Sequence, residues 1–444
     1  MKAKIYLETH GCQMNVADST RATKRLSSEG FQFVQSYDDA DIVILNTCSI
    51  RARAESKVFN RLGQINHNTI GKGKIYGVMG CVAQLEGEEL FRRSTMLDFV
   101  CGTGAIDRLP SLVSRILSGE KKVLDTGQRL SNENWDLQPA DHDTNHTAFV
   151  PIIEGCNKFC SYCIVPFSRG REISRPAVEI IKEVTNLRDS GFKEVQLIGQ
   201  NVNSYKPKTN EGLEEFAGAT PFIRLLKAVA ATGTNRIKFT TSFPKDFHAG
   251  IVEAMNEYQN LCNWVHLPVQ SGSDVILKAM RRGYKSADYL DKVAAIHNSH
   301  RNVALTTDII VGFPGENEDD FTSTLDLLKQ CNFHGVYIFK YSERPGTRAA
   351  NMDDDVADEV KTERFQQVEN LQREVQIKIY GSYIGTKQMV LVKGISARSE
   401  ADVFGHSTCN KVINFKGGTD LVGRVVEVKV VAAKHNSLYG ELAH

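Results

Sequence analysis

The chain has 444 residues, which exceeds the size of a single hydrophobic core, so that roughly two to four domains are expected. Its 41% hydrophobic and 24% charged residues are typical of a globular protein. The formal net charge of +1 excludes binding to polyanions by bulk charge, and any nucleic-acid surface must therefore be a local patch.

The amino terminus predicts a cytoplasmic protein. Residues 1–10 are charged and run directly into a strand-like segment, without the apolar core of a signal peptide. No run of about 18 uncharged apolar residues occurs, so that we expect no membrane-spanning helix. Because a reducing compartment disfavours disulfides, the ten cysteines need another explanation, and we expect a clustered subset to bind metal.

Residues 1–117 repeat a unit in which a short β-rich run precedes a segment with helical periodicity. The helical segments include 18–29 and 52–66. The β-rich runs are 4–9, 41–47 and 74–79. This alternation predicts an N-terminal α/β domain with a parallel sheet and right-handed crossovers.

A cysteine follows each of these three strands, at Cys12, Cys48 and Cys81. The loops after parallel strands all open on one edge of the sheet, where ligands bind. The three thiols can therefore converge although they are distant in sequence. Three ordinary buried thiols are the alternative, but their repetition at one place in successive units favours a shared ligand role.

Residues 118–147 are polar and weakly periodic, which is typical of a linker. A second βα series then runs from residue 148 to about residue 348, and the fold class is therefore α/β. Six units predict an incomplete barrel, because a complete one needs roughly 250 residues. The expected strands are 148–153, 194–198, 236–240, 264–267, 304–311 and 336–340, and the expected helices include 177–189, 221–231, 273–280 and 286–299.

The C-terminal part predicts one long, charged surface helix over 353–380 and a small β-barrel over 377–444. Its β-branched runs at 388–392 and 421–432 are separated by Gly, Ser and Asn turns. Residues 381–444 contain eight Lys and Arg against five Asp and Glu. This excess suits contacts with an RNA backbone, and a neutral solubilising module is the alternative.

Three cysteines, Cys156, Cys160 and Cys163, lie in one eight-residue loop after the first barrel strand. Three thiolates in a short loop fit a cuboidal iron–sulfur cluster. One iron of a four-iron cluster then has no protein sulfur and can accept a cofactor. A zinc site needs a fourth ligand nearby, and the next downstream cysteine is Cys262. An inert buried trio is the other alternative.

The spacing Cys-x3-Cys-x2-Cys, with Tyr162 before the last cysteine, resembles the radical S-adenosylmethionine superfamily. The resemblance implies that S-adenosylmethionine chelates the open iron through its amino and carboxylate groups. Its reductive cleavage to a 5′-deoxyadenosyl radical is the implied chemistry. A barrel that excludes water and side reactions suits such a radical.

The whole chain resembles the methylthiotransferase family, most clearly in 46–55 and 160–166. The resemblance implies that the cysteines at positions 12, 48 and 81 hold an auxiliary iron–sulfur cluster that carries sulfur. It implies a methylthio transfer to C2 of N6-isopentenyladenosine 37 in tRNA. One S-adenosylmethionine would methylate the cluster-bound sulfur, and a second would form the radical.

On this resemblance the partners are tRNA carrying isopentenyladenosine 37 and an electron donor such as flavodoxin or ferredoxin. We expect a monomer that does not bind membranes. The C-terminal barrel resembles the RNA-binding TRAM domain, but 405–408 lacks an arginine that the family often carries there. Arg398, Lys411 and Lys416 are expected to supply that charge. The implied domains are 1–117, the 118–147 linker, the 148–376 radical core and the 377–444 barrel.

Polar residues that follow the barrel strands are the expected contacts of S-adenosylmethionine, together with Tyr162. They are Gln200, Asn201, Ser242 and Gln270. The alternative is that each caps its adjoining turn. Arg169, Arg171 and Arg175 follow the cysteine loop, and they are expected to meet tRNA phosphates or a carboxylate, unless they form an ordinary ion-paired face.

Three other functions compete with this one. Two lie within the family: methylthiolation of threonylcarbamoyladenosine in tRNA, and methylthiolation of an aspartate in a ribosomal protein. The third is a non-catalytic RNA-binding protein that uses iron–sulfur clusters as redox sensors. The open iron of the 156–163 loop argues against a sensor.

Overall fold

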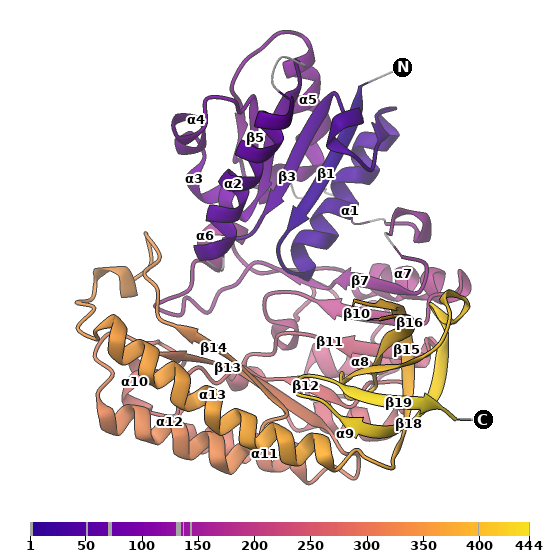
Figure 1. Cartoon of the computed structure of the whole chain (residues 1–444), viewed down its shortest axis with the longest axis vertical. Coiled ribbons are helices and arrows are strands. Elements are labelled where there is room, and N and C mark those ends of the chain that lie inside the picture. Colours follow the sequence, from indigo (N-terminus) through magenta and orange to yellow (C-terminus); the bar gives the residue numbers. More distant parts are fainter. Residues whose placement is uncertain are drawn as a thin grey trace. The chain divides into compact units, whose positions relative to one another are not determined.

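The structure is a computed structural model, which describes residues 3–49, 52–69, 73–129, 135, 137–142, 144–397 and 399–443. The chain divides into two compact units, each drawn in Figure 1. The first comprises Met1–Asp143, Glu154–Asn157 and Ile164–Ile173. The second comprises Thr144–Ile153, Lys158–Cys163 and Ser174–His444.

The first unit is built on a six-stranded parallel sheet in the order β2-β1-β3-β4-β5-β6 (Figure 1). The predicted parallel sheet is confirmed. Its strands are β1 (Lys4–His10), β2 (Gln32–Phe33), β3 (Ile42–Thr47), β4 (Ile75–Gly80), β5 (Phe99–Gly102) and β6 (Val123–Asp125). The last strand lies in the segment expected to be a linker. That expectation is wrong at this point, because Val123 is buried and pairs with Phe99 of β5.

Helices cover both faces of this sheet. They are α1 (Gln13–Ser28), α2 (Ala52–Thr69), α3 (Cys81–Glu86), α4 (Glu89–Arg93), α5 (Leu109–Leu117) and α6 (Val165–Arg169), and α6 packs on α3. Alternate residues of β3 enter two different cores: Ile42 and Ile44 pack with α1 and α5, whereas Val43 and Leu45 pack with α2. Burial on both faces explains the continuous apolar run of this strand.

The second unit contains the predicted six-stranded incomplete barrel. Its strands are β7 (Thr147–Pro151), β10 (Glu194–Ile198), β11 (Arg236–Phe239), β12 (Trp264–His266), β13 (Ala304–Val311) and β14 (Gly335–Lys340). They pair in parallel in chain order within two three-stranded sheets, and a parallel bridge between Ile237 and Leu261 links β11 to the segment before β12. The short strands β8 (Ile153–Glu154) and β9 (Ile173–Ser174) pair with each other.

The helices of the barrel pack their apolar faces on the strands around one large core, with one exception. They are α7 (Ala177–Asp189), α8 (Pro221–Ala231), α9 (Gly250–Glu257), α10 (Asp274–Ala279), α11 (Ser286–His297) and α12 (Glu318–Cys331). The exception is α10, whose Ile276 lies in a separate small cluster with Met280 and Phe313. The long helix α13 (Asp358–Gly381) begins five residues later than expected, because Asp354 and Asp355 bind Lys361 and the Gly315 amide. It is also not wholly a surface helix, since Val368 is fully buried.

The C-terminal segment forms a closed five-stranded barrel in the order β15-β16-β17-β19-β18. The strands are β15 (Lys387–Ser396), β16 (Ser399–Ser407), β17 (Val412–Lys416), β18 (Val425–Ala433) and β19 (Leu438–Leu442). The expected strand at 421–432 begins later, at Val425, because Thr419–Leu421 forms a 3-10 turn. The small β-barrel is confirmed.

A buried charge cluster joins this small barrel to strands β10 and β11 of the incomplete barrel. Glu194 is fully buried, and its carboxylate pairs with Arg236 and Lys238 at 3.1 Å each and with Lys393 of β15 at 3.0 Å. Arg236 also donates to the carbonyls of Met389, His406 and Ser407 in the barrel. Burial alone would raise the pKa of Glu194, but the three cations hold it far below its ordinary value.

Two partly buried histidines of the second unit, His334 and His406, are expected to make its free energy of unfolding decrease at acid pH. Burial lowers the pKa of His334 to about 3 and that of His406 to about 4, with Lys411 acting on the first and Lys238 on the second. Between pH 6.5 and 4 the unfolded chain therefore binds more protons than the folded chain. Stability is fully present above the ordinary histidine pKa and falls as the pH drops, on the order of 1–2 kcal/mol per histidine by pH 5.

Thermal unfolding of the apo-protein at pH 7.5 and pH 5 tests this expectation. His406→Asn should lose less stability between the two pH values than the parent. An equal loss in the parent, in His406→Asn and in His334→Asn would contradict it.

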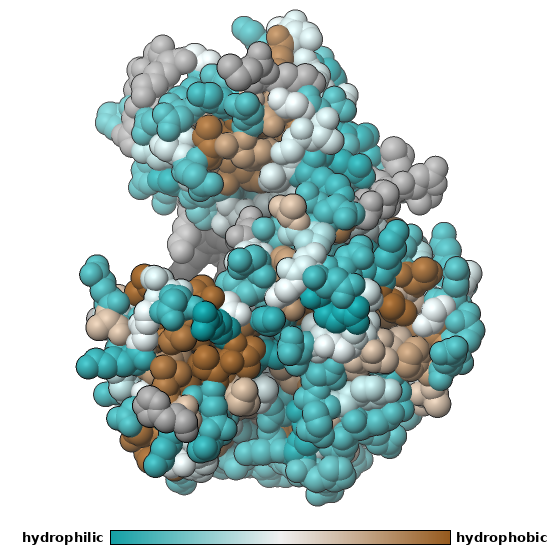
Figure 2. Space-filling model, turned by 90° about the vertical axis from the view of Figure 1, so that its right-hand side faces the viewer, coloured by the Kyte–Doolittle hydropathy of each residue, from teal (hydrophilic) through white to brown (hydrophobic). Residues whose placement is uncertain are grey.

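One face of the surface is mostly hydrophilic, with apolar side chains gathered in a few patches (Figure 2). Among the residues that the structure describes, none of the helices combines the length and the low polarity needed to cross a membrane.

Candidate metal centres

The three N-terminal cysteines leave the same edge of the first sheet. Cys12, Cys48 and Cys81 follow β1, β3 and β4, which are direct neighbours, and the strand ends pair as His10 with Thr47 and Thr47 with Gly80. The three cysteines therefore follow adjacent strand ends on one edge of the sheet, as the topology predicts. Cys48 and Cys81 are buried, and Cys12 is partly exposed.

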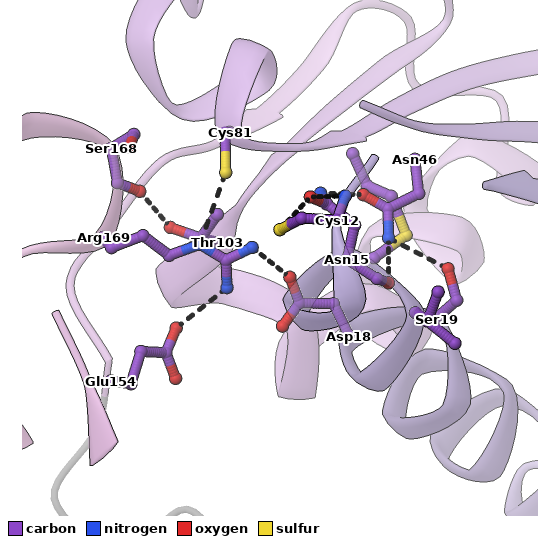
Figure 3. A network of polar contacts seen from close by, with 12 residues as sticks. Cys12, Asn15, Asp18, Ser19, Asn46, Cys81, Thr103, Glu154, Ser168 and Arg169 are labelled. Carbon is purple, nitrogen blue, oxygen red and sulfur yellow. Dashed lines mark hydrogen bonds and ion pairs between the residues drawn. The ribbon is translucent and has the colours of Figure 1, made fainter. Parts of the chain in front are cut away.

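A buried amide network supports two of these loops (Figure 3). The side-chain oxygen of Asn15 lies 3.3 Å from the Cys12 sulfur. The side-chain nitrogen of Asn15 donates to the side-chain oxygen of Asn46 and to the backbone carbonyl of Thr47. The side-chain nitrogen of Asn46 in turn donates to the backbone carbonyl of Asn15 and to the hydroxyl of Ser19. The network therefore connects the start of α1, next to Cys12, with the end of β3, which Cys48 directly follows.

Gly80 precedes Cys81 and has φ +98°, a conformation that favours glycine. A Cβ atom at this position would lie 2.4 Å from the Asn46 side-chain oxygen and 2.6 Å from the Thr47 carbonyl oxygen. Glycine therefore permits the close approach of β4 to β3 immediately before the cysteine.

Arg169 lies beside Cys81 and is almost fully buried (Figure 3). Its Nε donates to the Cys81 sulfur at 3.3 Å. Its two terminal nitrogens bind Asp18 at 2.6 Å and Glu154 at 3.2 Å. Arg129 pairs with the second oxygen of Glu154. Ion pairing was the alternative that the sequence left open for Arg169, and the structure shows ion pairs with Asp18 and Glu154; the thiol contact was not foreseen.

The thiols at this edge differ in acidity. A hydrogen bond with Cys48 is the main cause that lowers the pKa of Cys12 to about 6, against burial and with help from Arg169. Burial raises the pKa of Cys81, and Arg169 opposes that rise. Iron binds the thiolate form. A lowered thiol pKa and an adjacent guanidinium therefore fit a site for a thiolate-bound cluster.

No three His, Cys, Asp or Glu side chains in the described ranges are grouped closely enough to share a single metal ion. Three thiolates of a cuboidal cluster bind three separate irons and stand further apart than the ligands of one ion. All ten cysteines lie in the described part and remain thiols. The sheet edge therefore offers three thiols as donors, and their role as cluster ligands stays a prediction.

The cysteine loop 156–163 is anchored at several points along its backbone. Cys156 donates its amide to the carbonyl of Gly170, and Ser161 donates its amide to the carbonyl of Met280. The Cys163 amide donates to the carbonyl of Cys160 at 3.0 Å. At Gly155 φ is +81°, and a Cβ atom there would lie 2.1 Å from the Arg171 carbonyl oxygen.

Arg282 holds the second half of this loop and was missed in the sequence. Its guanidinium lies 3.5 Å from the Cys160 sulfur and 3.4 Å from the Tyr162 hydroxyl, and it donates to the Pro268 carbonyl at 2.6 Å. The cation also lies over the ring of Phe243. Burial raises the pKa of Tyr162 well above its ordinary value, which keeps the hydroxyl protonated.

The expected S-adenosylmethionine contacts follow neighbouring barrel strands. Asn201, Ser242 and Gln270 are buried, and Gln200 is partly exposed. Within the described residues, the hydroxyl of Ser242 is buried without a hydrogen-bond partner, as is that of Thr240 at the same strand end. Gln270 has φ +79° and pairs through its backbone with β13. Buried, unsatisfied hydroxyls at a strand end fit a polar ligand.

The three expected RNA contacts have different outcomes. Arg398 lies outside the described residues. Lys411 is buried, its ammonium donates to the carbonyl of His334 at 3.0 Å and lies over the ring of Tyr380, so that the expectation of a surface contact is wrong. Lys416 is exposed at the end of β17. Arg175 pairs with the buried Glu183 instead of facing solvent.

Family models match three successive parts of the chain. They are the "Uncharacterized protein family UPF0004" over residues 4–102, the radical SAM superfamily over 150–328 and the TRAM domain over 381–443. The tRNA-2-methylthio-N(6)-dimethylallyladenosine synthase of Geobacter metallireducens is 43% identical and covers 99% of this chain and 98% of its own length. The protein of the same name from Legionella pneumophila is 40% identical over 100% and 98%.

Two solved structures share the fold. The radical S-adenosylmethionine methyltransferase TsrM from Kitasatospora setae, with cobalamin and a [4Fe-4S] cluster bound, has a TM-score of 0.56 at 12% identity over 79% of this chain and 77% of its own. The cobalamin-dependent S-adenosylmethionine radical enzyme OxsB has a TM-score of 0.54 at 12% identity over 83% and 56%. At this identity the likeness concerns the fold alone.

Proposed function

Because the chain belongs to the tRNA-2-methylthio-N6-dimethylallyladenosine synthase family, we propose that it adds a methylthio group to C2 of N6-isopentenyladenosine 37 in tRNA. The observation that carries the proposal is the identity of about 40% along the entire chain. The radical SAM and TRAM matches agree with a radical transferase that acts on RNA. The membership also agrees with the methylthiotransferase resemblance seen in the sequence.

Two sets of cysteines are proposed to hold the metal. Cys156, Cys160 and Cys163 would bind a [4Fe-4S] cluster with an open iron for S-adenosylmethionine, and Cys12, Cys48 and Cys81 would bind the auxiliary cluster. When bound, the first supplies the electron that cleaves S-adenosylmethionine, and the second holds the sulfur that becomes methylated and is transferred. The chain contributes six cysteine thiols, of which Cys12 has a lowered pKa, and a buried arginine beside each set.

Around the open iron, Ser242 is proposed to donate its unpartnered hydroxyl to the bound S-adenosylmethionine. Gln200, Asn201 and Gln270 are proposed to hydrogen-bond its ribose or carboxylate from the adjoining strand ends. The protonated Tyr162 hydroxyl, held by Arg282, is proposed to face the cofactor from the cysteine loop.

Further partners belong to the same proposal. Lys416, which is exposed, would contact the tRNA backbone from the 377–444 barrel, and Arg398 is proposed to do the same. The domains 1–117 and 148–376 would serve the auxiliary and the radical cluster, with flavodoxin or ferredoxin as electron donor. We propose a monomer that acts in the cytoplasm.

Mass spectrometry of tRNA nucleosides tests the substrate. Cells that lack the protein should lose 2-methylthio-isopentenyladenosine and accumulate isopentenyladenosine, and the wild-type gene should restore the product. Unchanged levels of that nucleoside, with loss of 2-methylthio-threonylcarbamoyladenosine or of a methylthiolated ribosomal-protein aspartate, would favour one of the other family activities.

A further inference from the structure

The segments on both sides of the 156–163 cysteine loop belong to the first unit, together with the N-terminal cysteines. Glu154 lies two residues before Cys156, and Arg169 lies six residues after Cys163, at the end of α6. The side chains of Glu154 and Arg169 meet each other and Asp18 of α1 (Figure 3). Within the first unit, the segments that flank the cysteine loop therefore contribute Glu154 and Arg169 to the sheet edge at which Cys81 lies.

Each nitrogen of the Arg169 guanidinium has a different acceptor. The Cys81 sulfur lies 3.3 Å from Nε, and the carboxylates of Asp18 and Glu154 take the two terminal nitrogens. A planar guanidinium offers its donors in a rigid fork, whereas a lysine ammonium is a point charge on a flexible stem. The two carboxylates therefore fix the plane of Arg169 and aim its third nitrogen at the sulfur.

The charges around Arg169 favour its ionised form. The adjacent Asp18, Cys81 and Glu154 raise the pKa of Arg169 well above its ordinary value against burial. Burial alone would raise the pKa of Glu154, but the guanidinia of Arg129 and Arg169 hold it below its ordinary value. A buried ion pair adds little net stability over an apolar pair of the same shape. A contribution to folding stability alone therefore does not explain why the Arg169 guanidinium, already paired with two carboxylates, also donates a hydrogen bond to the Cys81 sulfur.

We propose that Arg169 is a positioning residue for the iron ligand Cys81, which orients the thiolate and stabilises its negative charge through a directed hydrogen bond. The inference rests on the proposed function only in taking Cys12, Cys48 and Cys81 as ligands of the auxiliary cluster. Hydrogen bonds to ligating sulfurs make a cluster easier to reduce and harder to lose.

The test uses the full chain with Cys156, Cys160 and Cys163 all replaced by alanine, so that bound iron belongs to the N-terminal cysteines. In this parent, Arg169→Gln should release iron to a chelator about 10-fold faster, and its cluster should have a lower reduction potential. Arg169→Lys keeps the positive charge but loses the planar guanidinium. Its rate of iron release and its reduction potential should therefore lie between those of the parent and those of Arg169→Gln. Neither measurement depends on catalytic activity.

Arg175→Gln is the matched control, because Arg175 is equally buried and pairs with Glu183 at 2.7 Å. It should leave the rate of iron loss and the potential at the parent's values. Melting of each apo-protein separates misfolding from ligand effects, and if Arg169→Gln does not fold, faster iron loss in folded Arg169→Lys supports the proposal.

If a folded Arg169 variant loses iron at the parent's rate and has the parent's reduction potential, the inference on Arg169 is overturned, while the proposed function is not affected. A parent that assembles no iron at all would overturn both the inference and the auxiliary cluster of the proposed function. The two failures are therefore distinguishable.

Discussion

Replacing Cys156 with alanine is expected to abolish the reductive cleavage of S-adenosylmethionine, whereas Cys48→Ala should leave that cleavage intact and stop methylthiolation. The reason is that the two residues belong to different sets of thiols: Cys156 to the 156–163 loop, and Cys48 to the sheet edge of the first unit. Loss of one thiolate from a set of three leaves a cluster with too few protein ligands.

The measurement is anaerobic incubation of each variant with dithionite, S-adenosylmethionine and isopentenylated tRNA, followed by quantification of 5′-deoxyadenosine and of the methylthiolated nucleoside. Cys262→Ala is the control, because Cys262 is a buried thiol outside both sets, and it should form both products. Full methylthiolated product from Cys48→Ala would refute the assignment of two separate clusters. Absence of 5′-deoxyadenosine from the parent would favour the redox sensor.

The convergence of Cys12, Cys48 and Cys81 could be predicted because it follows from topology. A strand–helix alternation implies parallel strands, and parallel strands place their following loops on one edge. The structure pairs β1 with β3 and β3 with β4. The strand order alone therefore places the three cysteines on one edge, and no knowledge of side-chain contacts was needed to predict this. The incomplete barrel was predictable for the same reason, because its parallel strands follow one another in chain order within each of its two three-stranded sheets.

The arginines beside the thiols could not be predicted. Arg169 meets Cys81 across 88 positions, and Arg282 meets Cys160 across 122. The sequence shows an arginine after the cysteine loop, but periodicity carries no information on which distant acceptor a long side chain reaches. The unsatisfied hydroxyl of Ser242 became evident only from its burial.

The error at Lys411 has a related cause. A count of basic residues in 381–444 does not distinguish an exposed lysine from one that is enclosed. Lys411 caps the carbonyl of His334 in the radical core and has its pKa lowered to about 8 by burial. It therefore anchors the barrel to the core, as Arg236 and Lys393 do at the buried carboxylate of Glu194.

Glu194 is the shared counter-ion of this anchor. Its two oxygens receive Arg236 and Lys238 of β11 and Lys393 of β15, and Gln196 donates to it at 2.9 Å. Lys238 also donates to the side-chain oxygen of Asn410 in the barrel. Because the carboxylate and Lys238 are buried, water cannot replace a missing partner without opening the interface.

Glu194→Ala is therefore expected to destabilise the second unit by about 3–5 kcal/mol, since it leaves three enclosed cations without their common carboxylate. Thermal and urea unfolding of the apo-protein measure the effect, and Glu194→Gln should show most of it because the amide has the same size but no charge. Glu427→Ala is the matched control: it removes a carboxylate from an exposed pair with Lys387 on the same barrel and should change stability by less than about 0.5 kcal/mol. If Glu194→Ala and Glu427→Ala unfold at the same urea concentration, the Glu194 cluster does not hold the barrel on the core.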